Sequence, residues 1–498
     1  MNIHSRSMRR SMTGLVILAM AATACGGGGG SIVDSGSTEA PSTSDGGSST
    51  EAPSTSAAPL ADLPPCDPSA LDGASETVNI TFWHGMNGEL EKSLVALTDE
   101  YNASQTKVKV SLENQGGYEQ TLDKYLQSGG SLPDIVQAPE YAVQVMNDTE
   151  SNVPVGACIE AESYDTSDFQ PKALGQYFTE GVQWAMPFNV SDPVLYYNKK
   201  VFAAAGLDPE APPTSLEELR TMSQAIVDSG AAAFGLALDT GADSGGGWFL
   251  EQWFAKLGEF YSDNDNGRTA PSTKVLFDSQ TGIDLLTQIQ SLVDDGLAVN
   301  VGDNASGQDA LLKLADPDKP AAMTIATSAA LGTVLSVVAA GTIAGVGVDD
   351  IGVGPMPGPN GAPGAIVGGA SLWIVDNGDA VKTAATWDYI KFLVSAQSQS
   401  TWASATGYVP VRSAALELDP VKSTYASDAR FRVAYDQLGE AADTPAAVGA
   451  ILGPQREIRN ITALAIATIL QGGDVAETLT SSASQANALI ADYNASNG

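Results

Sequence analysis

Few residues in this 498-residue chain are arranged for catalysis or for binding a metal. Beyond the first 25 residues the chain has one histidine, His84, and no nucleophile motif surrounds it, so a Ser-His-Asp or Cys-His system finds no support. No CxxC string or Cys/His cluster suggests a metal site, and the acidic run 262–273 fails the calcium-loop pattern, with Ser262 first and Thr273 twelfth. No GxxxxGK(S/T) string is present. We therefore expect a protein that binds rather than catalyses, with no cofactor.

A short export pattern ends at Cys25. Three arginines near the start are followed by the apolar stretch 15–20 and by four small residues directly before the cysteine. The apolar stretch is too short to span about 30 Å of hydrocarbon. The pattern resembles a bacterial lipobox, which implies cleavage before Cys25 and lipidation of that residue; an ordinary cleaved signal with a chance cysteine is the alternative. We predict that 1–24 is a lipoprotein signal peptide and that Cys25 anchors the protein to the outer face of the bacterial cell membrane.

The stretch 25–75 has the composition of a leash. It contains a run of five glycines and two near-repeats rich in Ser, Thr and Pro, at 37–44 and 49–56. Such a sequence cannot bury enough apolar surface to offset the entropy lost on ordering, so we predict that it is disordered. As a coil, about 50 residues would reach roughly 40 Å, which would lift a globular body off the membrane.

Two further cysteines, Cys66 and Cys158, remain in a chain that we expect to be exported. An even pair in an oxidising compartment favours a disulfide, which would fix the end of the leash to the body. The alternative is a pair of free thiols.

The composition is strongly acidic, with 59 acidic and 24 basic residues and a formal net charge of −35. Such a surface argues against nucleic acid or an anionic membrane as a partner. We interpret the acidity as a source of solubility, so any anion site must depend on local donors. The length beyond the leash exceeds what one small core needs and suits two domains.

Strand-like and helix-like segments alternate through the body. The first five follow in the order strand, helix, strand, helix, strand, at 78–83, 89–101, 108–112, 118–126 and 134–136. This order predicts a parallel sheet covered by helices. Later strands are expected at 194–197, 234–238, 321–325 and 365–375, and later helices from a capping box at 214–217 to about 227, around 285–293, and at 381–395, 458–470 and 476–493. The glycine-rich stretch 341–364 is expected to form loops.

Several strings along the body resemble one family closely. They are FWHGMNGEL at 82–90, GYEQ at 117–120, PFNVS at 187–191, PVLYYNK at 193–199, AAAGLDPE at 203–210, GGASLW at 368–373, TGY at 406–408 and IR at 458–459. In order and spread they are similar to the extracellular solute-binding proteins of bacterial ABC importers, family 1, and within it to the glycerol-3-phosphate binders. The strings YYNK and GLDP are common in the wider family and support only the fold, whereas FWH, GYEQ and GGASLW are more specific.

The resemblance implies an α/β fold of two lobes joined by hinge strands, with a ligand cleft between lobes that close on the ligand. It also implies that lobe one comprises 76–188 plus 328–376 and that lobe two comprises 189–327 plus 377–498. The implied partners are a small-molecule ligand and the transmembrane permease of an importer whose ATPase is a separate chain. We expect a monomer with no nucleic-acid partner.

The ligand site of the family, carried over residue by residue, falls on positions that could bind a phosphate ester. These positions are Tyr118, Glu140, Ser191, Gly369, Tyr408 and Arg459, with Thr327 where the family has Ser and Trp248 as a further aromatic residue. A phosphate dianion favours a guanidinium, hydroxyls and backbone N–H groups, which this set would supply. A carboxylate repels phosphate, so we expect Glu140 at the other end of the site, where it accepts from glycerol hydroxyls.

Each position also has an interpretation that needs no ligand. Arg459 could form a surface ion pair, the tyrosines and Trp248 could pack in the core, and Ser191 and Gly369 could serve a turn or a tight backbone approach.

One departure from the family concerns the size of the ligand. Where the glycerol-3-phosphate binders have Trp three residues before the position of Trp248, this chain has Gly245, within a run of three glycines. Without this indole, the site would have more space for a ligand and less apolar contact with a small glycerol backbone. We therefore expect glycerol 3-phosphate or a bulkier glycerophosphodiester such as glycerophosphocholine, whose cation could meet an aromatic ring.

Two other functions are the alternatives. An oligosaccharide-binding protein of a sugar importer would keep the fold, but sugar sites favour several aromatic platforms and paired carboxylates and do not need Arg459. A secreted hydrolase would need a carboxylate pair at fixed spacing or a metal, and the sequence shows neither.

Overall fold

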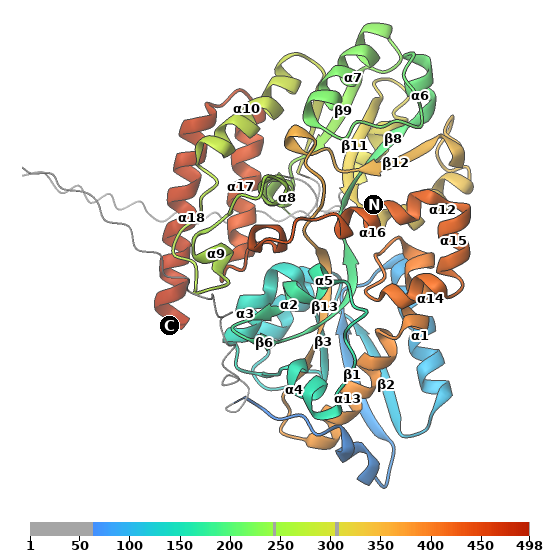
Figure 1. The fold of residues 1–498 in the computed structure, drawn as a ribbon, viewed down its shortest axis with the longest axis vertical. Coiled ribbons are helices and arrows are strands. Elements are labelled where there is room, and N and C mark those ends of the chain that lie inside the picture. Colours follow the sequence, from blue (N-terminus) through green and yellow to red (C-terminus); the bar gives the residue numbers. More distant parts are fainter. Residues whose placement is uncertain (1–62, 243–245, 304–307, 498) are drawn as a thin grey trace, which may run out of the picture. The chain divides into compact units, whose positions relative to one another are not determined.

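Two β-sheets, each covered by helices, form the protein, which we describe from a computed structural model (Figure 1). The structure describes residues 63–242, 246–303 and 308–497. We call the first sheet with its helices lobe one and the second lobe two, and this arrangement confirms the expected two-lobe α/β fold.

Lobe one contains a six-stranded sheet in the order β2-β1-β3-β13-β4, with β7 paired to β13. Its strands are β1 (Val78–His84), β2 (Val108–Asn114), β3 (Ile135–Pro139), β4 (Asn152–Val153), β7 (Met186–Ser191) and β13 (Gly368–Val375). β1 pairs in parallel with both β2 and β3, as the alternating strand–helix pattern predicts. β13 runs antiparallel to β3 and β7, so a segment far along the chain completes this sheet.

Lobe two contains a five-stranded sheet in the order β10-β9-β11-β8-β12. Its strands are β8 (Pro193–Asn198), β9 (Phe234–Asp239), β10 (Ala298–Gly302), β11 (Ala321–Thr327) and β12 (Ile351–Pro355). β9 runs parallel to β10 and β11, whereas β8 runs antiparallel to β11 and β12. A separate small hairpin pairs β5 (Phe178–Thr179) with β6 (Val182–Gln183).

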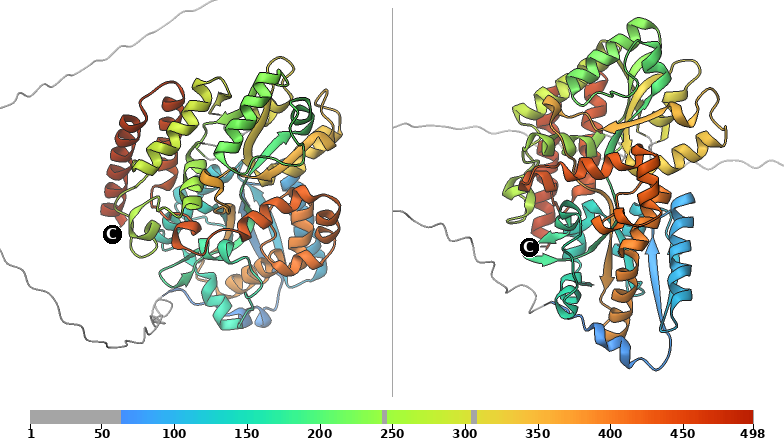
Figure 2. Two further views of the ribbon diagram at one scale, coloured as in Figure 1. Left: turned by 45° about the horizontal axis from the view of Figure 1, so that its top comes forward. Right: turned by 45° about the vertical axis from the view of Figure 1, so that its right-hand side comes forward.

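Helices cover both sheets and fill the segments between strands. In chain order they are α1 (Gly88–Ser104), α2 (Tyr118–Gln127), α3 (Val143–Asp148), α4 (Val155–Glu162), α5 (Pro171–Gln176), α6 (Lys199–Ala204), α7 (Leu216–Ser229), α8 (Gly246–Leu257), α9 (Asp263–Gly267), α10 (Gln280–Asp294), α11 (Gln308–Leu312), α12 (Leu331–Ala339), α13 (Ala380–Leu393), α14 (Ala396–Thr406), α15 (Val421–Ser427), α16 (Val433–Gly439), α17 (Gln455–Leu470) and α18 (Val475–Asn497). Helices α10, α17 and α18 pack together, as Figures 1 and 2 both show.

Each lobe has its own hydrophobic core. Phe82, Leu372 and Trp387 are buried in the core of lobe one. Phe254 and Ile469 are buried in the core of lobe two. The cluster of lobe one also contains Val194 and Ile351 of the second sheet, so this core continues into lobe two.

A capping box begins α7. The Ser215 hydroxyl accepts from the Glu218 N–H at 3.0 Å, and the Glu218 carboxylate accepts from the Ser215 N–H at 3.3 Å. The box predicted at 214–217 is therefore one residue early, because the residue with extended N-cap backbone is Ser215 and not Thr214.

The chain passes from lobe one to lobe two at Asp192, between β7 and β8, and returns between β12 and β13. At least three segments, β12, α13 and α14, lie outside their predicted lobes; α14, predicted in lobe two, packs on α1 of lobe one. β12, predicted in lobe one, pairs with β8 at the edge of the lobe-two sheet. α13, predicted in lobe two, packs on β1 of lobe one, where Trp387 and Ile390 fill the core. The boundaries implied by the resemblance are corrected at these segments.

β12 also lies within the stretch 341–364 that was expected to form loops. Its glycines have a packing reason: a Cβ on Gly352 would lie 2.1 Å from the ring of Tyr197 on β8. The backbone of β12 therefore approaches an aromatic ring too closely for any side chain. Glycine in a sequence marks such an approach as readily as a loop, which explains the error.

Cys66 and Cys158 form a disulfide, and both residues are buried. The bond joins the segment before β1 to α4. In the described part of the chain, no helix combines the length and apolar character needed to cross a membrane.

Candidate functional site

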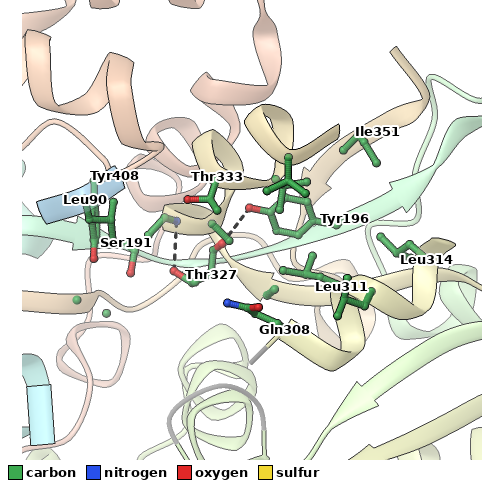
Figure 3. Close-up of a pocket in the computed structure, with 18 of the residues that line it drawn as sticks. Leu90, Ser191, Tyr196, Gln308, Leu311, Leu314, Thr327, Thr333, Ile351 and Tyr408 are labelled. Carbon is green, nitrogen blue, oxygen red and sulfur yellow. Dashed lines mark hydrogen bonds between the residues drawn. The ribbon is translucent and has the colours of Figure 1, made fainter. Parts of the chain in front are cut away.

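A pocket of about 470 Å³ brings together all eight residues predicted for ligand binding. They are Tyr118, Glu140, Ser191, Trp248, Thr327, Gly369, Tyr408 and Arg459. Their elements belong to both lobes: β7 and β13 come from the first sheet, and β11 from the second. Figure 3 shows Ser191 and Tyr408 at one side of the pocket, with Thr327 nearer its middle. The structure therefore gathers these residues, and their contact with a ligand stays a prediction.

Two tyrosine hydroxyls meet in the pocket. Those of Tyr118, which begins α2, and Tyr408 lie 2.9 Å apart. The Asn189 amide donates to the Tyr118 hydroxyl at 2.6 Å, and Gln137 Nε2 donates to Asn189 Oδ1 at 2.9 Å. The Gly85 N–H in turn donates to Gln137 Oε1 at 2.9 Å. This chain of buried hydrogen bonds fixes the position of Tyr118 relative to the first sheet.

Burial keeps both hydroxyls protonated. It raises the pKa of Tyr118 well above its usual range, with a further rise from Tyr408 beside it. Burial likewise raises the pKa of Tyr408. Both groups keep their protons at any ordinary pH, so the hydroxyl that does not donate to its neighbour can donate to an anion.

The backbone of β13 approaches β7 closely at Gly369. This residue has φ of +90°, and a Cβ on it would lie 2.0 Å from the Asn189 carbonyl oxygen. Only glycine fits such an approach. The adjacent Ser191 ends β7, pairs with Gly368 across the sheet and is 3% exposed. The tight-approach interpretation of Gly369 thus holds, together with its place in the pocket wall.

Trp248, in α8, offers a buried donor. Its ring lies against Gly368, where a Cβ would come within 2.4 Å of ring carbon Cζ2. Among the described residues its indole N–H has no hydrogen-bond partner. Because an unpaired buried donor is costly, this N–H is suited to an acceptor on a ligand in the pocket.

Arg459, in α17, is 2% exposed and contacts carboxylates of both lobes. Its Nε and Nη2 donate to the two carboxylate oxygens of Glu251 in α8, at 2.7 and 2.8 Å. Its Nη1 donates to Oε1 of Glu140 at 2.8 Å. The guanidinium also lies 5.1 Å from the ring centre of Tyr141. A surface ion pair is therefore the wrong interpretation of Arg459.

The contact between Arg459 and Glu140 corrects one expectation. Glu140 was placed at the opposite end of the site from the arginine, on the argument that a carboxylate repels phosphate. The short 3-10 helix that Glu140 begins, Glu140–Ala142, instead faces α17, and the two charges pair directly. A buried guanidinium needs an opposite charge, and these two carboxylates meet that need.

Thr327 ends β11, and its hydroxyl accepts from the Ala329 N–H at 3.3 Å. It therefore starts the following turn as well as lining the pocket. The sequence prediction missed Glu251 and the pair Gln137 and Asn189. For Glu251 a signal exists: a carboxylate in the aromatic run 248–254 must be buried and so needs a partner.

Much of the remaining pocket wall is aliphatic and was not predicted. Its aliphatic residues come from α11, α12, β12 and the segments beside them, and include Leu311, Leu314, Val334, Val337, Val338, Ile343, Val346 and Ile351. Gln308 and Thr333 are polar residues of the same wall. Among residues 63–242, 246–303 and 308–497, no group of three or more His, Cys, Asp or Glu side chains is placed to hold a metal ion.

Comparison with known proteins agrees with this geometry. The model of a family described as bacterial extracellular solute-binding protein matches residues 96–430. The sn-glycerol-3-phosphate-binding periplasmic protein UgpB of Pectobacterium atrosepticum is 29% identical over 432 residues, covering 84% of this chain and 92% of the relative.

Among solved structures, UgpB of Mycobacterium tuberculosis in complex with glycerophosphocholine is similar with a TM-score of 0.68 at 22% identity, covering 84% of this chain and 99% of that one. The cyclic α-maltosyl-1,6-maltose binding protein of Arthrobacter globiformis is similar with a TM-score of 0.67 at 23% identity, covering 83% and 99%. At these identities the structures support the fold alone. From the family match and the fold together, the chain belongs to the bacterial extracellular solute-binding proteins, which are substrate-binding components of ABC importers outside the cytoplasm and not enzymes.

Proposed function

We propose that this protein binds glycerol 3-phosphate or a glycerophosphodiester, such as glycerophosphocholine, and delivers it to the permease of an ABC importer. The observation that carries the proposal is the convergence of Arg459 with the hydroxyls of Tyr118, Tyr408 and Ser191 on one pocket. A guanidinium with several neutral donors is the set that a phosphate group favours.

Binding would exchange partners around Arg459. Glu251 holds the Nε and Nη2 side of the guanidinium, so the phosphate would take the place of Glu140 at Nη1. Glu140 would then accept from the glycerol hydroxyls, and the indole N–H of Trp248 would donate to a phosphate oxygen. Because these residues come from both lobes, a bound ligand would favour the closed arrangement.

The glycerol-3-phosphate-binding relatives support the phosphate ester as the ligand class. Gly245, on which the preference for a larger diester was based, lies outside the described residues, so that preference still rests on the sequence argument.

One observation favours an oligosaccharide as the second candidate. Tyr118, Tyr141, Trp248 and Tyr408 line the pocket together with the carboxylate of Glu140, and aromatic rings beside a carboxylate suit a sugar. The similar protein of Arthrobacter globiformis binds cyclic α-maltosyl-1,6-maltose. A sugar would leave the Arg459 ion pairs in place.

Calorimetric titration with glycerol 3-phosphate, glycerophosphocholine and maltose separates the two candidates. For the phosphate esters, Arg459→Ala should cost about 2–4 kcal/mol, or roughly 30–1,000-fold in affinity. Arg459→Lys keeps a charge between the carboxylates but not the planar fork, so it should also weaken binding. Arg432→Ala is the matched control, because this half-exposed arginine pairs with Asp436 away from the pocket.

Thermal unfolding of each variant shows whether it is folded before titration. Phosphate-ester affinity within threefold of wild type in folded Arg459→Lys and Arg459→Ala would show that the phosphate is not held by this residue. Maltose binding without phosphate-ester binding would establish the second candidate.

The sequence at Cys25 adds a proposal on location. We expect the mature chain to be tethered by a lipid on Cys25 to the outer face of the bacterial cell membrane and to act as a monomer, with the ATPase on a separate chain.

A further inference from the structure

The ligand pocket continues beyond its polar end into an aliphatic chamber. We use this name for the part lined by Leu311, Leu312, Leu314, Val334, Val337, Val338, Ile343, Val346 and Ile351. In Figure 3, Ser191 and Tyr408 lie at one side of the pocket, and Leu311, Leu314 and Ile351 lie at the other, with Thr327 between them. The polar site and the chamber therefore share one continuous space.

The charged side chains in the pocket wall, Glu140 and Arg459, are paired with each other at the polar end. The nearby Tyr196 hydroxyl already donates to the Thr327 carbonyl oxygen at 2.9 Å. Gln308 and Thr333 add two polar side chains to the pocket wall near the chamber, and the other residues of the chamber offer a ligand methyl and methylene groups.

Helix α12 accounts for much of this wall. Val334, Val337 and Val338 stand at spacings of three and four residues, so they form one stripe on the helix. Val334 and Val337 are only partly buried. A helix normally covers such a stripe against a core, whereas here part of it faces the pocket.

A small ligand that is polar throughout would leave this apolar wall against water, at a cost of about 25 cal/mol for each Å². We propose that the chamber holds a single aliphatic chain of the ligand, so that the ligand class is an amphiphile with a glycerol phosphate head and one alkyl or acyl chain. This inference rests on the proposed function for the head group. The chamber adjoins the polar site within the same pocket. An aliphatic chain attached to a head group bound among Tyr118, Ser191 and Arg459 could therefore extend into it.

The inference sets the expected dependence on chain length. Burying one methylene contributes about 0.8 kcal/mol, which corresponds to roughly fourfold in affinity. Affinity should therefore rise by about this factor for each added methylene until the chamber is full, and then level off.

The test is calorimetric titration of the full chain with glycerol 3-phosphate and with its 1-O-ethyl, butyl, hexyl and octyl ethers, each below its micellar concentration. Leu312→Gln places an amide in the chamber wall at a residue that is 53% exposed, so it should fold normally and reduce the gain per methylene. Leu464→Gln makes the same change on α17 at a residue that is 70% exposed and outside the pocket wall, and it should leave the gain unchanged. Val337→Trp, which fills the chamber, should weaken the octyl ether and leave glycerol 3-phosphate unaffected.

The outcomes separate this inference from the proposed function. If glycerol 3-phosphate binds but affinity is flat or falls along the series, the chamber does not hold a chain and the head-group proposal stands. If no member of the series binds, both proposals are wrong. If affinity rises with length equally in wild type, Leu312→Gln and Val337→Trp, the chain lies elsewhere and the inference is overturned.

Discussion

At the scale of single residues, the pocket poses an electrostatic question. Arg459 pairs with Glu140 and Glu251, so these three side chains together carry a formal charge of −1. Such a cluster holds the guanidinium in place but opposes an incoming phosphate dianion. The anion would be favoured only if Glu140 moves to the glycerol hydroxyls, as the proposed exchange of partners requires.

Glu251→Gln tests this balance. The amide still accepts from the guanidinium, while the cluster loses one negative charge. Two unit charges about 6 Å apart interact by about 3 kcal/mol at an effective dielectric constant of about 20. Some of this gain is lost because a neutral acceptor holds Arg459 less firmly. The affinity for glycerol 3-phosphate should therefore rise by at least about threefold in calorimetric titration.

Maltose is the control ligand. Because this sugar is neutral, its affinity should not rise when the cluster loses one negative charge. A tenfold or larger loss of phosphate-ester affinity in Glu251→Gln would contradict the prediction and show that orientation of Arg459 outweighs repulsion.

The residues that the sequence could and could not predict differ in kind. Five of the eight pocket residues lie in short strings that resemble a family, and Glu140, Thr327 and Trp248 follow from the family's site outside those strings. The structure gathers all eight on one pocket. Asn189 and Gln137 could not be predicted, because each acts through a partner from a distant part of the chain. The contact of Glu140 with Arg459 was not predicted for the same reason: the two residues lie far apart in the chain, and only the fold brings their charges together.

At the scale of elements, the corner between β7 and β8 contains a buried carboxylate. Asp192 is fully buried where the chain passes between the lobes, and its backbone is fixed by Ser328, whose N–H donates to the Asp192 carbonyl oxygen at 2.9 Å. Burial raises the pKa of Asp192 well above its usual range, while Gln437 and the Lys256 ammonium act in the opposite direction.

Asp192→Asn should stabilise the protein at pH 7. The raised pKa means that the folded state binds the proton more tightly than the unfolded state. The free energy of unfolding therefore falls as the pH rises from the unfolded value toward the folded value, and Asn removes this loss. We expect a gain of roughly 1–3 kcal/mol at pH 7 and little or none at pH 4, measured by denaturant unfolding.

Asp294→Asn, at an exposed position at the end of α10, is the control and should change little at either pH. A destabilised Asp192→Asn at both pH values would show that the ionised carboxylate has a stabilising partner.

The elements themselves were largely predictable. Strands and helices with clear apolar periodicity, such as β1, α1 and α17, appear within a few residues of their expected bounds. The errors fall where tertiary contact overrides local pattern: β12 is a strand despite its glycines, and α13 packs on lobe one instead of lobe two. The lobe and the secondary structure of such segments depend on their tertiary contacts, which local sequence patterns do not show.

At the scale of the whole molecule, the distribution of charge fits an extracytoplasmic binding protein. The net charge of −35 gives no general attraction for an anionic ligand, so selection of a phosphate depends on donors inside the pocket. Raised salt should not reproduce the loss expected for Arg459→Ala, because a buried site is poorly screened. The acidic surface likewise gives no affinity for an anionic membrane.

The membrane attachment that we propose would therefore need a covalent anchor, and Cys25 is the residue whose sequence context predicts one. Lipid chains contribute about 0.8 kcal/mol for each buried methylene, which is enough for two chains to hold a protein that has no other affinity for the bilayer.

In a bacterial host, wild type should remain with the membrane fraction after a high-salt wash, whereas Cys25→Ala should be recovered in the soluble extracytoplasmic fraction or the medium. Fatty-acid labelling should be lost in the same variant. Cys66→Ala combined with Cys158→Ala removes the disulfide but should leave the label and the membrane fraction unchanged. If Cys25→Ala stays with the membrane as wild type does, the anchor lies elsewhere and the export pattern ends in a chance cysteine.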